Sequence, residues 1–366
     1  MKKGIILMTG GGTAGHVNPN LALAPQLLKE GYELHYAGTA DGIERKLVEA
    51  AGNIEYHVVS SGKLRRYFSM KNLSDPFKVL HGVNEARALV RELKPDVVFS
   101  KGGFVSVPVV IGAHGKAPVI IHESDYTPGL ANRIAIRYAD TVCVTFEDTL
   151  KFVPGKGVHT GTPVRHALYE GKRENGLALA GFEGNKPVLL IMGGSLGAKT
   201  LNEGMAALKQ RLLAQPNLYV VQSTGKGGYD AAAEALALTD EEAKRWKLAP
   251  YIDNMGDVLA AADLVLSRAG ASSIAEIAAL GVPAVLVPYP FATEDHQTTN
   301  ARFLTDANAA VLFTDDEVKG EAFGEKLLEL VQNEGERAAM RAAAAGLAQD
   351  QAASKLADEL EKVARG

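Results

Sequence analysis

The stretch Met8-Thr9-Gly10-Gly11-Gly12-Thr13-Ala14-Gly15-His16 (MTGGGTAGH) closes a short apolar segment with a glycine-rich turn. It satisfies the pattern G-x-G-x-x-G, and a helical pattern follows it. Glycine lets the backbone approach an anion closely, and the start of a helix directs free N–H groups at it. The stretch therefore predicts the strand, turn and helix that open a parallel α/β sheet, with an anion site at the turn.

Two further glycine turns follow apolar segments. Gly193-Gly194-Ser195-Leu196-Gly197 repeats the order strand, GG[T/S]xG, helix in the second half of the chain, and Lys101-Gly102-Gly103-Phe104 follows the segment 97–100. The repetition predicts two similar α/β domains that handle more than one phosphate group. The alternative is that each cluster is only a tight turn between a strand and a helix.

Short apolar runs alternate with longer helical patterns along the whole chain, which is typical of parallel sheets covered by helices. The predicted strands are 5–9, 34–37, 56–59, 97–100, 119–121, 141–145, 188–192, 219–223, 264–267 and 284–288. A chain of 366 residues exceeds one typical core. We place the linker near 162–165, which predicts domains at 1–164 and 165–344, and we assign a closing helix at about 345–366 to the first domain.

Composition excludes several classes. A net charge of −4 gives no general attraction to nucleic acid. Cys143, the single cysteine, allows no internal disulfide and lies between two valines, as in a buried strand. The segment His35 to Thr39 ends without the acidic residue that an NAD site requires, so a dehydrogenase is disfavoured. We find no apolar run of about 20 residues and no signal peptide, and we expect a cytoplasmic protein.

The order of five motifs resembles the MurG family of glycosyltransferases. The motifs are Gly11–His16, Lys101–Phe104, His122–Asp125, Gly193–Ala198 and Arg268–Glu276. The resemblance implies a GT-B fold, in which two Rossmann-like domains face each other across a cleft. It implies inverting transfer of N-acetylglucosamine from UDP-N-acetylglucosamine to the C4 hydroxyl of the muramoyl sugar of lipid I, giving lipid II in peptidoglycan synthesis. No cofactor is implied.

The departing UDP develops negative charge, which something preorganised and positive must stabilise. The sequence has no Asp-x-Asp pair to hold a metal. The amides of Gly194 to Gly197, the Ser195 hydroxyl and Arg165 are the predicted replacements, and the resemblance places Arg165 on the donor phosphates.

The resemblance also assigns the remaining donor contacts. It places Ile252 against the uracil, Glu276 on the ribose, and the turn Gly270, Ala271, Ser272 and Ser273 close to the nucleotide. Arg268 caps this turn or meets the uracil side or the phosphates, and His296 and Gln297 read the sugar hydroxyls. One alternative stays open: Ser273 and Glu276 also fit a capping box, with Ser273 as the N-cap.

The acceptor is assigned to the first domain. The resemblance places Thr13, Ala14 and Gly15 toward the acceptor's pyrophosphate. His16, at the end of that turn, is the predicted general base, with Asp125 or Glu123 as alternatives. Asp125 stands where many family members carry asparagine, which puts its contact with the acceptor sugar in doubt.

The segment 61–71 combines four cations with apolar side chains and is predicted to dock on an anionic membrane, assisted by Phe77. An ordinary solvated loop is the alternative. The resemblance places the protein peripherally on the cytoplasmic face of the cell membrane, with lipid I and other cell-wall synthesis and division proteins as partners. Rival functions are another lipid-directed GT-B transferase, a UDP-N-acetylglucosamine 2-epimerase and a non-catalytic member of the assembly.

Overall fold

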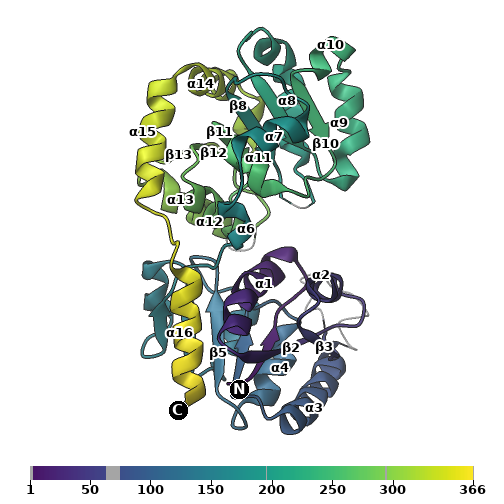
Figure 1. Ribbon diagram of the computed structural model, residues 1–366, viewed down its shortest axis with the longest axis vertical. Helices are drawn as coiled ribbons and strands as arrows, with labels where there is room; N and C mark the ends of the chain where they lie inside the picture. The colour runs from purple at the N-terminus through teal and green to yellow at the C-terminus, as the bar shows by residue number, and fades with distance from the viewer. Residues whose placement is uncertain (1–2, 63–74, 195, 293–294, 366) are drawn as a thin grey trace. The chain divides into compact units, whose positions relative to one another are not determined.

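The computed structural model describes residues 3–62, 75–194, 196–292 and 295–365. The chain forms two compact units, Met1–Arg165 with Gln349–Gly366 and His166–Ala348. Each unit is a parallel sheet covered by helices, so the predicted α/β class is confirmed (Figure 1).

The first unit has a seven-stranded sheet in the order β3-β2-β1-β4-β5-β6-β7. Its inner strands are apolar on both faces because helices cover both sides. The strands are β1 (Gly4–Thr9), β2 (Tyr32–Gly38), β3 (Glu55–Val58), β4 (Val97–Ser100), β5 (Val119–Glu123), β6 (Thr141–Val144) and β7 (Gly157–His159). The helices are α1 (Ala14–Lys29), α2 (Ile43–Ala51), α3 (Asp75–Leu93), α4 (Ser106–Ala113), α5 (Leu130–Ala135) and α16 (Ala352–Arg365).

The last helix, α16, completes the first unit rather than the second. Leu356 and Leu360 are fully buried and belong to the same apolar cluster as Leu23 and Leu27 of α1. Figure 1 shows α16, in yellow, lying beside α1. Burial of these side chains fixes the end of the chain to the unit in which it began.

The second unit has a six-stranded sheet in the order β10-β9-β8-β11-β12-β13. The strands are β8 (Val188–Met192), β9 (Tyr219–Ser223), β10 (Trp246–Ala249), β11 (Leu264–Ser267), β12 (Ala284–Leu286) and β13 (Ala310–Leu312). The helices are α6 (His166–Tyr169), α7 (Arg173–Ala180), α8 (Lys199–Leu213), α9 (Tyr229–Leu236), α10 (Asp240–Ala243), α11 (Met255–Ala261), α12 (Ala271–Leu280), α13 (His296–Thr305), α14 (Glu321–Gln332) and α15 (Glu334–Ala345).

The strand orders determine where each unit can bind a ligand. In each sheet the order reverses at one point, between β1 and β4 in the first unit and between β8 and β11 in the second. Ligands of open α/β sheets bind at the carboxyl ends of the strands beside such a point. The three predicted glycine turns follow β1, β4 and β8, and the segment Arg268–Glu276 follows β11. The sequence motifs therefore gather at these two positions.

Candidate functional site

The turn after β8 is built so that only glycine fits. Gly194 and Gly197 have φ values of +81° and +79°. A Cβ atom on Gly197 would lie 2.0 Å from the carbonyl oxygen of Thr224, in the turn after β9. The two turns thus pack backbone against backbone, and α8 begins directly behind them. Ser195 lies outside the described residues.

A hollow of about 380 Å³ opens beside this turn. Its lining is mostly backbone and small side chains, and it includes Leu196, Gly197, Ala198, Asn202, Thr224 and Gly228. Asn202 is buried, and its side-chain amide donates to Thr224 O, at 3.1 Å. Asn202 therefore holds the turn after β9, against which Gly197 packs, and the amide of Gly197 donates to Gly194 O, at 3.0 Å, within its own turn.

The second helix at this switch point, α12, begins earlier than the capping-box interpretation requires. Gly270 is its N-cap, and Ala271 is its first residue. Ser273 and Glu276 therefore lie within the helix, and the capping box is wrong. The first amides of the helix, at Ala271, Ser272 and Ser273, have no intrahelical acceptor and point out of its start. Its first turn carries no acidic side chain that would neutralise them.

Glu276 lies one turn further along α12. Ser272 and Ser273 are four and three residues before it, so all three share one flank of the helix. These three residues are half-buried, whereas Ile274 and Ile277 on the opposite flank are buried in the core. A carboxylate on the open flank suits a pair of hydroxyl groups, as predicted for the ribose.

The structure directs Arg268 into the unit. Its Nη1 donates to Val287 O and Pro288 O, at 3.1 and 3.0 Å, and lies 2.5 Å from Asp315 Oδ1. The side chain is buried. A guanidinium engaged in this way stabilises the turns after β11 and β12, and Arg268 is a positioning residue in this conformation. Sequence reasoning missed Asp315.

His296 and Gln297, the pair predicted to bind the sugar hydroxyls, are the first two residues of α13. Gln297 Oε1 accepts a hydrogen bond from Tyr289 N, at 2.9 Å, so its amide NH₂ group remains the end that can donate to a ligand. His296 is the first helical residue and is half-buried. Behind them, the buried side chain of Asn300 donates to Ala269 O, at 3.4 Å, which links α13 to the turn after β11.

Ile252 and Arg165 lie in connecting segments. Ile252 is half-buried in the turn after β10, beside the exposed ring of Tyr251. Arg165 is the last residue of the first unit before α6. Its Nε is buried and makes no hydrogen bond to a described residue. A buried guanidinium N–H without a partner is costly, and an anionic ligand would satisfy it.

In the first unit, α1 begins at Ala14 with Thr13 as its N-cap, and no described side chain caps it. The buried carboxylate of Glu44 accepts from Gly12 N, at 3.2 Å, which fixes the turn but removes that amide from the ligand side. The amides of Ala14 and Gly15 remain at the helix start. Sequence reasoning missed Glu44, which lies 32 residues from the turn it holds.

His16 is held in one orientation. Its Nδ1 lies 3.1 Å from Gly11 O and 3.0 Å from Thr13 Oγ1. Because a carbonyl can only accept, Nδ1 carries the proton and Nε2 presents its lone pair. Burial, assisted by the positive charge of Lys101, lowers the pKa of His16 to about 4. The imidazole is therefore neutral at pH 7, in the form that accepts a proton.

Glu123 is committed to the loop that carries Asp125. Its carboxylate accepts from Asp125 N at 2.8 Å, Gly129 N at 3.1 Å and Asn132 Nδ2 at 2.8 Å. Burial and the neighbouring Asp125 raise the pKa of Glu123. With its oxygens occupied, Glu123 is a positioning residue, and the half-buried Asp125 is the carboxylate that the loop presents.

Lys101 supplies the positive charge behind this loop. It follows β4 and is fully buried, and its Nζ donates to Ser124 Oγ. Burial lowers the pKa of Lys101 while Glu123 and Asp125 oppose the change. The buried Lys101 and Glu123 and the half-buried Asp125 thus form one charge cluster, and Lys101 and Asp125 act electrostatically on His16. The sequence singled out Lys101 only as the neighbour of two glycines.

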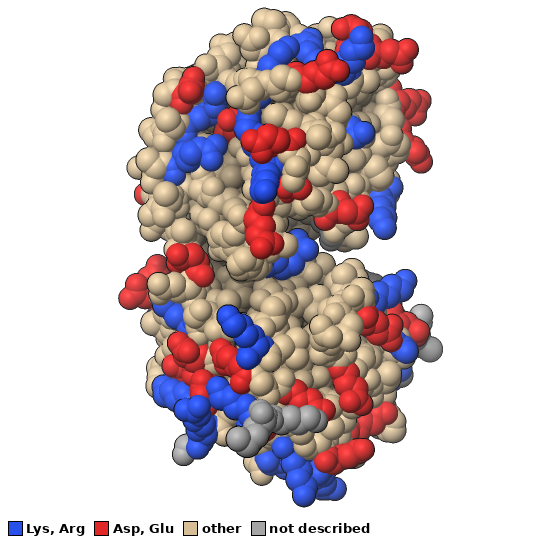
Figure 2. All heavy atoms as spheres, in the orientation of Figure 1, with Lys and Arg blue, Asp and Glu red and all other residues tan. Residues whose placement is uncertain are grey.

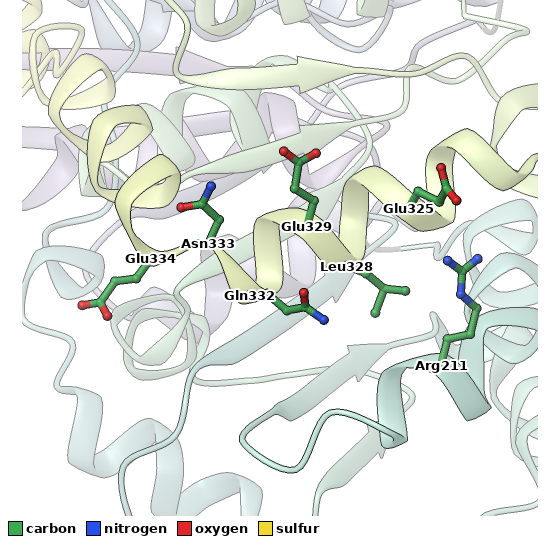
Figure 3. Close-up of a pocket in the computed structure, with 7 residues that line it drawn as sticks. All are labelled: Arg211, Glu325, Leu328, Glu329, Gln332, Asn333 and Glu334. Carbon is green, nitrogen blue, oxygen red and sulfur yellow. The ribbon is translucent and has the colours of Figure 1, made fainter.

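A larger hollow of about 620 Å³ lies elsewhere on the second unit. Figure 3 shows it between the end of α8, which carries Arg211, and the α14–α15 corner. Its lining is Arg211, Glu325, Leu328, Glu329, Gln332, Asn333 and Glu334. None of these is a predicted site residue, and the end of α8 lies away from the turn at its beginning, so this hollow is separate from the switch point.

Family models define the class of protein. The glycosyltransferase family 28 N-terminal domain matches residues 6–144, and the family 28 C-terminal domain matches residues 188–360. Together they cover β1 to β6 of the first unit and the whole sheet of the second. The two switch points and their glycine turns are therefore those of a two-domain glycosyltransferase.

Relatives with higher sequence identity identify one family within this class of glycosyltransferases. The UDP-N-acetylglucosamine–N-acetylmuramyl-(pentapeptide) pyrophosphoryl-undecaprenol N-acetylglucosamine transferase of Clostridium botulinum strain Langeland is 48% identical over 337 residues, 91% of this chain and 92% of the relative. That of Clostridium tetani is 47% identical, with 91% of each chain covered. The crystal structure of Acinetobacter baumannii MurG is 32% identical, with a TM-score of 0.76 over 98% of this chain and 99% of that one. The chain belongs to this family of N-acetylglucosaminyltransferases.

A second structural neighbour shares the fold of this chain at a much lower sequence identity. A putative UDP-N-acetylglucosamine 2-epimerase from Listeria monocytogenes has a TM-score of 0.69 over 98% of this chain and 96% of that one, at 14% identity. At that identity the likeness is one of fold. The assignment of this chain to its family rests on the sequence motifs and on the relatives of higher sequence identity.

Proposed function

We propose that this protein transfers N-acetylglucosamine from UDP-N-acetylglucosamine to the C4 hydroxyl of the muramoyl sugar of lipid I, with inversion at the anomeric carbon. Two observations support the proposal: the starts of α8 and α12 in the second unit have no side-chain cap among the described residues, and His16 in the first unit is neutral and held in one orientation. The relatives are named for both substrates.

The second unit is the proposed donor site. As the bond to the sugar breaks, charge grows on the β-phosphate of UDP. The starts of α8 and α12 supply preorganised donors for that charge. We add Arg165, the last residue of the first unit, because its buried Nε makes no hydrogen bond to a described residue and an anion would satisfy it. The amide of Gln297 donates to the sugar, and Glu276 accepts from the ribose. The mechanism requires no divalent ion because these groups supply the positive potential.

The first unit is the proposed acceptor site. The amides of Ala14 and Gly15 face the acceptor's pyrophosphate, and His16 Nε2 takes the proton of the C4 hydroxyl. An alcohol is far less acidic than imidazolium, so the proton leaves late, as the new glycosidic bond forms. Asp125 lies on the same side and orients the acceptor sugar.

We further propose that the protein works as a peripheral protein on the cytoplasmic face of the membrane that holds lipid I. In the part of the chain that the structure describes, every helix is too short or too polar to cross a bilayer. Figure 2 shows Lys and Arg mixed with Asp and Glu over the visible face of each unit, so docking needs a local element. The four cations of the predicted segment 61–71 lie outside the described residues. Phe77 and Leu80, which follow the segment in sequence on α3, are 74% and 62% exposed.

An acceptor comparison tests this function. Purified protein is incubated with labelled UDP-N-acetylglucosamine and, in parallel, with lipid I, with diacylglycerol or without acceptor. The proposal predicts a labelled lipid product only with lipid I. Label on diacylglycerol would indicate a different lipid-directed transferase, and conversion of the free donor to its 2-epimer would indicate the epimerase. Donor binding without product in any arm would indicate a non-catalytic protein.

A further inference from the structure

A compact group of metal-ligand side chains lies at the edge of the first unit, away from the switch point. It consists of His35 on β2 and of Glu55 and His57 on the edge strand β3. His35 pairs with Glu55 in the parallel register, and His57 is two residues further along β3. Because successive side chains on a strand alternate between faces, all three project from the same face of the sheet.

The three groups converge on one point. His35 Nδ1 lies 2.9 Å from His57 Nε2 and 3.7 Å from Glu55 Oε2, and His57 Nε2 lies 3.9 Å from Glu55 Oε1. Two ligand atoms bound to a tetrahedral Zn²⁺ at about 2.0–2.1 Å lie about 3.3 Å apart. The observed separations bracket that value, so an ion between the three groups needs only small side-chain adjustments.

The facing ring nitrogens of His35 and His57 suit a metal. A neutral imidazole is the form that ligates a metal. A hydrogen bond between the two rings has one facing nitrogen as donor and the other as acceptor and so uses only one lone pair, whereas an ion uses both.

The other side of His35 has the arrangement found behind metal-bound histidines. Its Nε2 is buried, makes no hydrogen bond to a described residue and lies 3.5 Å from Glu33 Oε1. A carboxylate behind the second ring nitrogen orients the imidazole and makes it a stronger ligand. The side chain of His35 is only 4% exposed, so its position is fixed by packing rather than by solvent.

We propose that His35 Nδ1, His57 Nε2 and the Glu55 carboxylate bind one divalent ion of the zinc class, with water completing its coordination. Two imidazoles and a carboxylate favour Zn²⁺ over Mg²⁺ or Ca²⁺. The ion joins β3, a four-residue strand at the end of the sheet, to β2. Its role is to stabilise this edge, and the sugar-transfer chemistry of the switch points does not use it.

Metal binding to untagged protein, stripped of metal with a chelator that is then removed, tests the proposal. Zn²⁺ titration followed by calorimetry is expected to give one equivalent per chain, and Co²⁺ is expected to give the visible absorption bands of a tetrahedral site. Glu55→Gln and His57→Asn are each expected to weaken binding at least about tenfold, since each removes one of three ligands. Zn²⁺ is expected to raise the Tm of the wild type and of neither variant.

The control is His166→Asn. His166, at the start of α6, and Glu170, directly after this helix, form an exposed pair 3.4 Å apart, so this variant removes a histidine–glutamate pair that is not part of the proposed site. Its Zn²⁺ binding is expected to match the wild type. Glu55 is 66% exposed, so Glu55→Gln leaves the core intact and keeps the test valid if His57→Asn misfolds. Absence of stoichiometric binding to the wild type, or full binding by Glu55→Gln, would overturn the proposal. UDP-N-acetylglucosamine binding to the stripped protein shows separately whether the donor site is intact.

Discussion

Replacing His16 tests the proposed base. His16→Gln keeps a donor toward Gly11 O, which His16 Nδ1 approaches at 3.1 Å, but it removes the basic nitrogen. A positioned general base typically contributes about 10²- to 10⁴-fold to a rate, or about 3–5 kcal/mol of the barrier. We therefore expect kcat to fall by about that factor. Affinity for UDP-N-acetylglucosamine, measured by calorimetry, is expected to stay unchanged because the donor site lies on the other unit.

The pH dependence of kcat/KM is an independent test of His16 as the base. The folded-state pKa of His16 is about 4, below the ordinary value of 6.5. Protonated His16 cannot accept a proton, so kcat/KM is expected to stay level from pH 7 to 5 and to fall as pH drops through about 4. This fall in kcat/KM at low pH is expected to be absent in His16→Gln. The control is His114→Gln, at an exposed histidine after α4. A loss of less than tenfold in His16→Gln would refute the assignment and favour Asp125 as the base.

Three other perturbations address the donor site and the membrane. Arg165→Ala is expected to weaken UDP binding by about 10- to 100-fold, which is the usual contribution of a hydrogen bond to a charged group. Arg165→Lys is expected to recover only part of this affinity. Equal UDP affinity in the wild type and both variants would contradict this role. Gly197→Ala is expected to lower the Tm, because it combines a φ of +79° with a Cβ 2.0 Å from a carbonyl oxygen, and an unchanged melting curve would show that the turn can relax. Neutralising Lys63, Arg65 and Arg66 together is expected to cost about 3 kcal/mol of binding to anionic liposomes while UDP-N-acetylglucosamine affinity persists, and unchanged liposome binding would remove the segment from the interface.

The interior of the fold was predictable from the sequence, and most of its edges were not. The ten predicted strands all occur. Nine are interior strands, which are apolar runs because helices cover both faces, and the tenth is the edge strand β3. The three missed strands are β7, β10 and β13, which lie at the ends of their sheets and have three or four residues each. Their partly exposed sequences carry little periodic signal.

The local structure of the candidate site was predictable where one short motif makes a whole turn. The glycine turns and His16 belong to such motifs, and the strand order of the first unit places the turns after β1 and β4 at one switch point. Contacts between residues far apart in the sequence could not be predicted. Arg268 pairs with Asp315, and Gly12 pairs with Glu44, but no local sequence pattern connects these segments. The capping-box alternative for Ser273 and Glu276 was wrong because serine is a common N-cap, whereas α12 takes Gly270 as its N-cap.

The central claim is that amide dipoles and Arg165 stabilise the departing UDP without a divalent ion. The most direct measurement is the initial rate of N-acetylglucosamine transfer to lipid I in EDTA and in Mg²⁺, well below the Tm. Glu55→Gln is measured alongside the wild type, so that any effect of removing zinc from the β2–β3 edge is recognised. The account predicts equal rates in EDTA and in Mg²⁺ for both proteins. Transfer that stops in EDTA and returns with Mg²⁺, in both proteins, would contradict it.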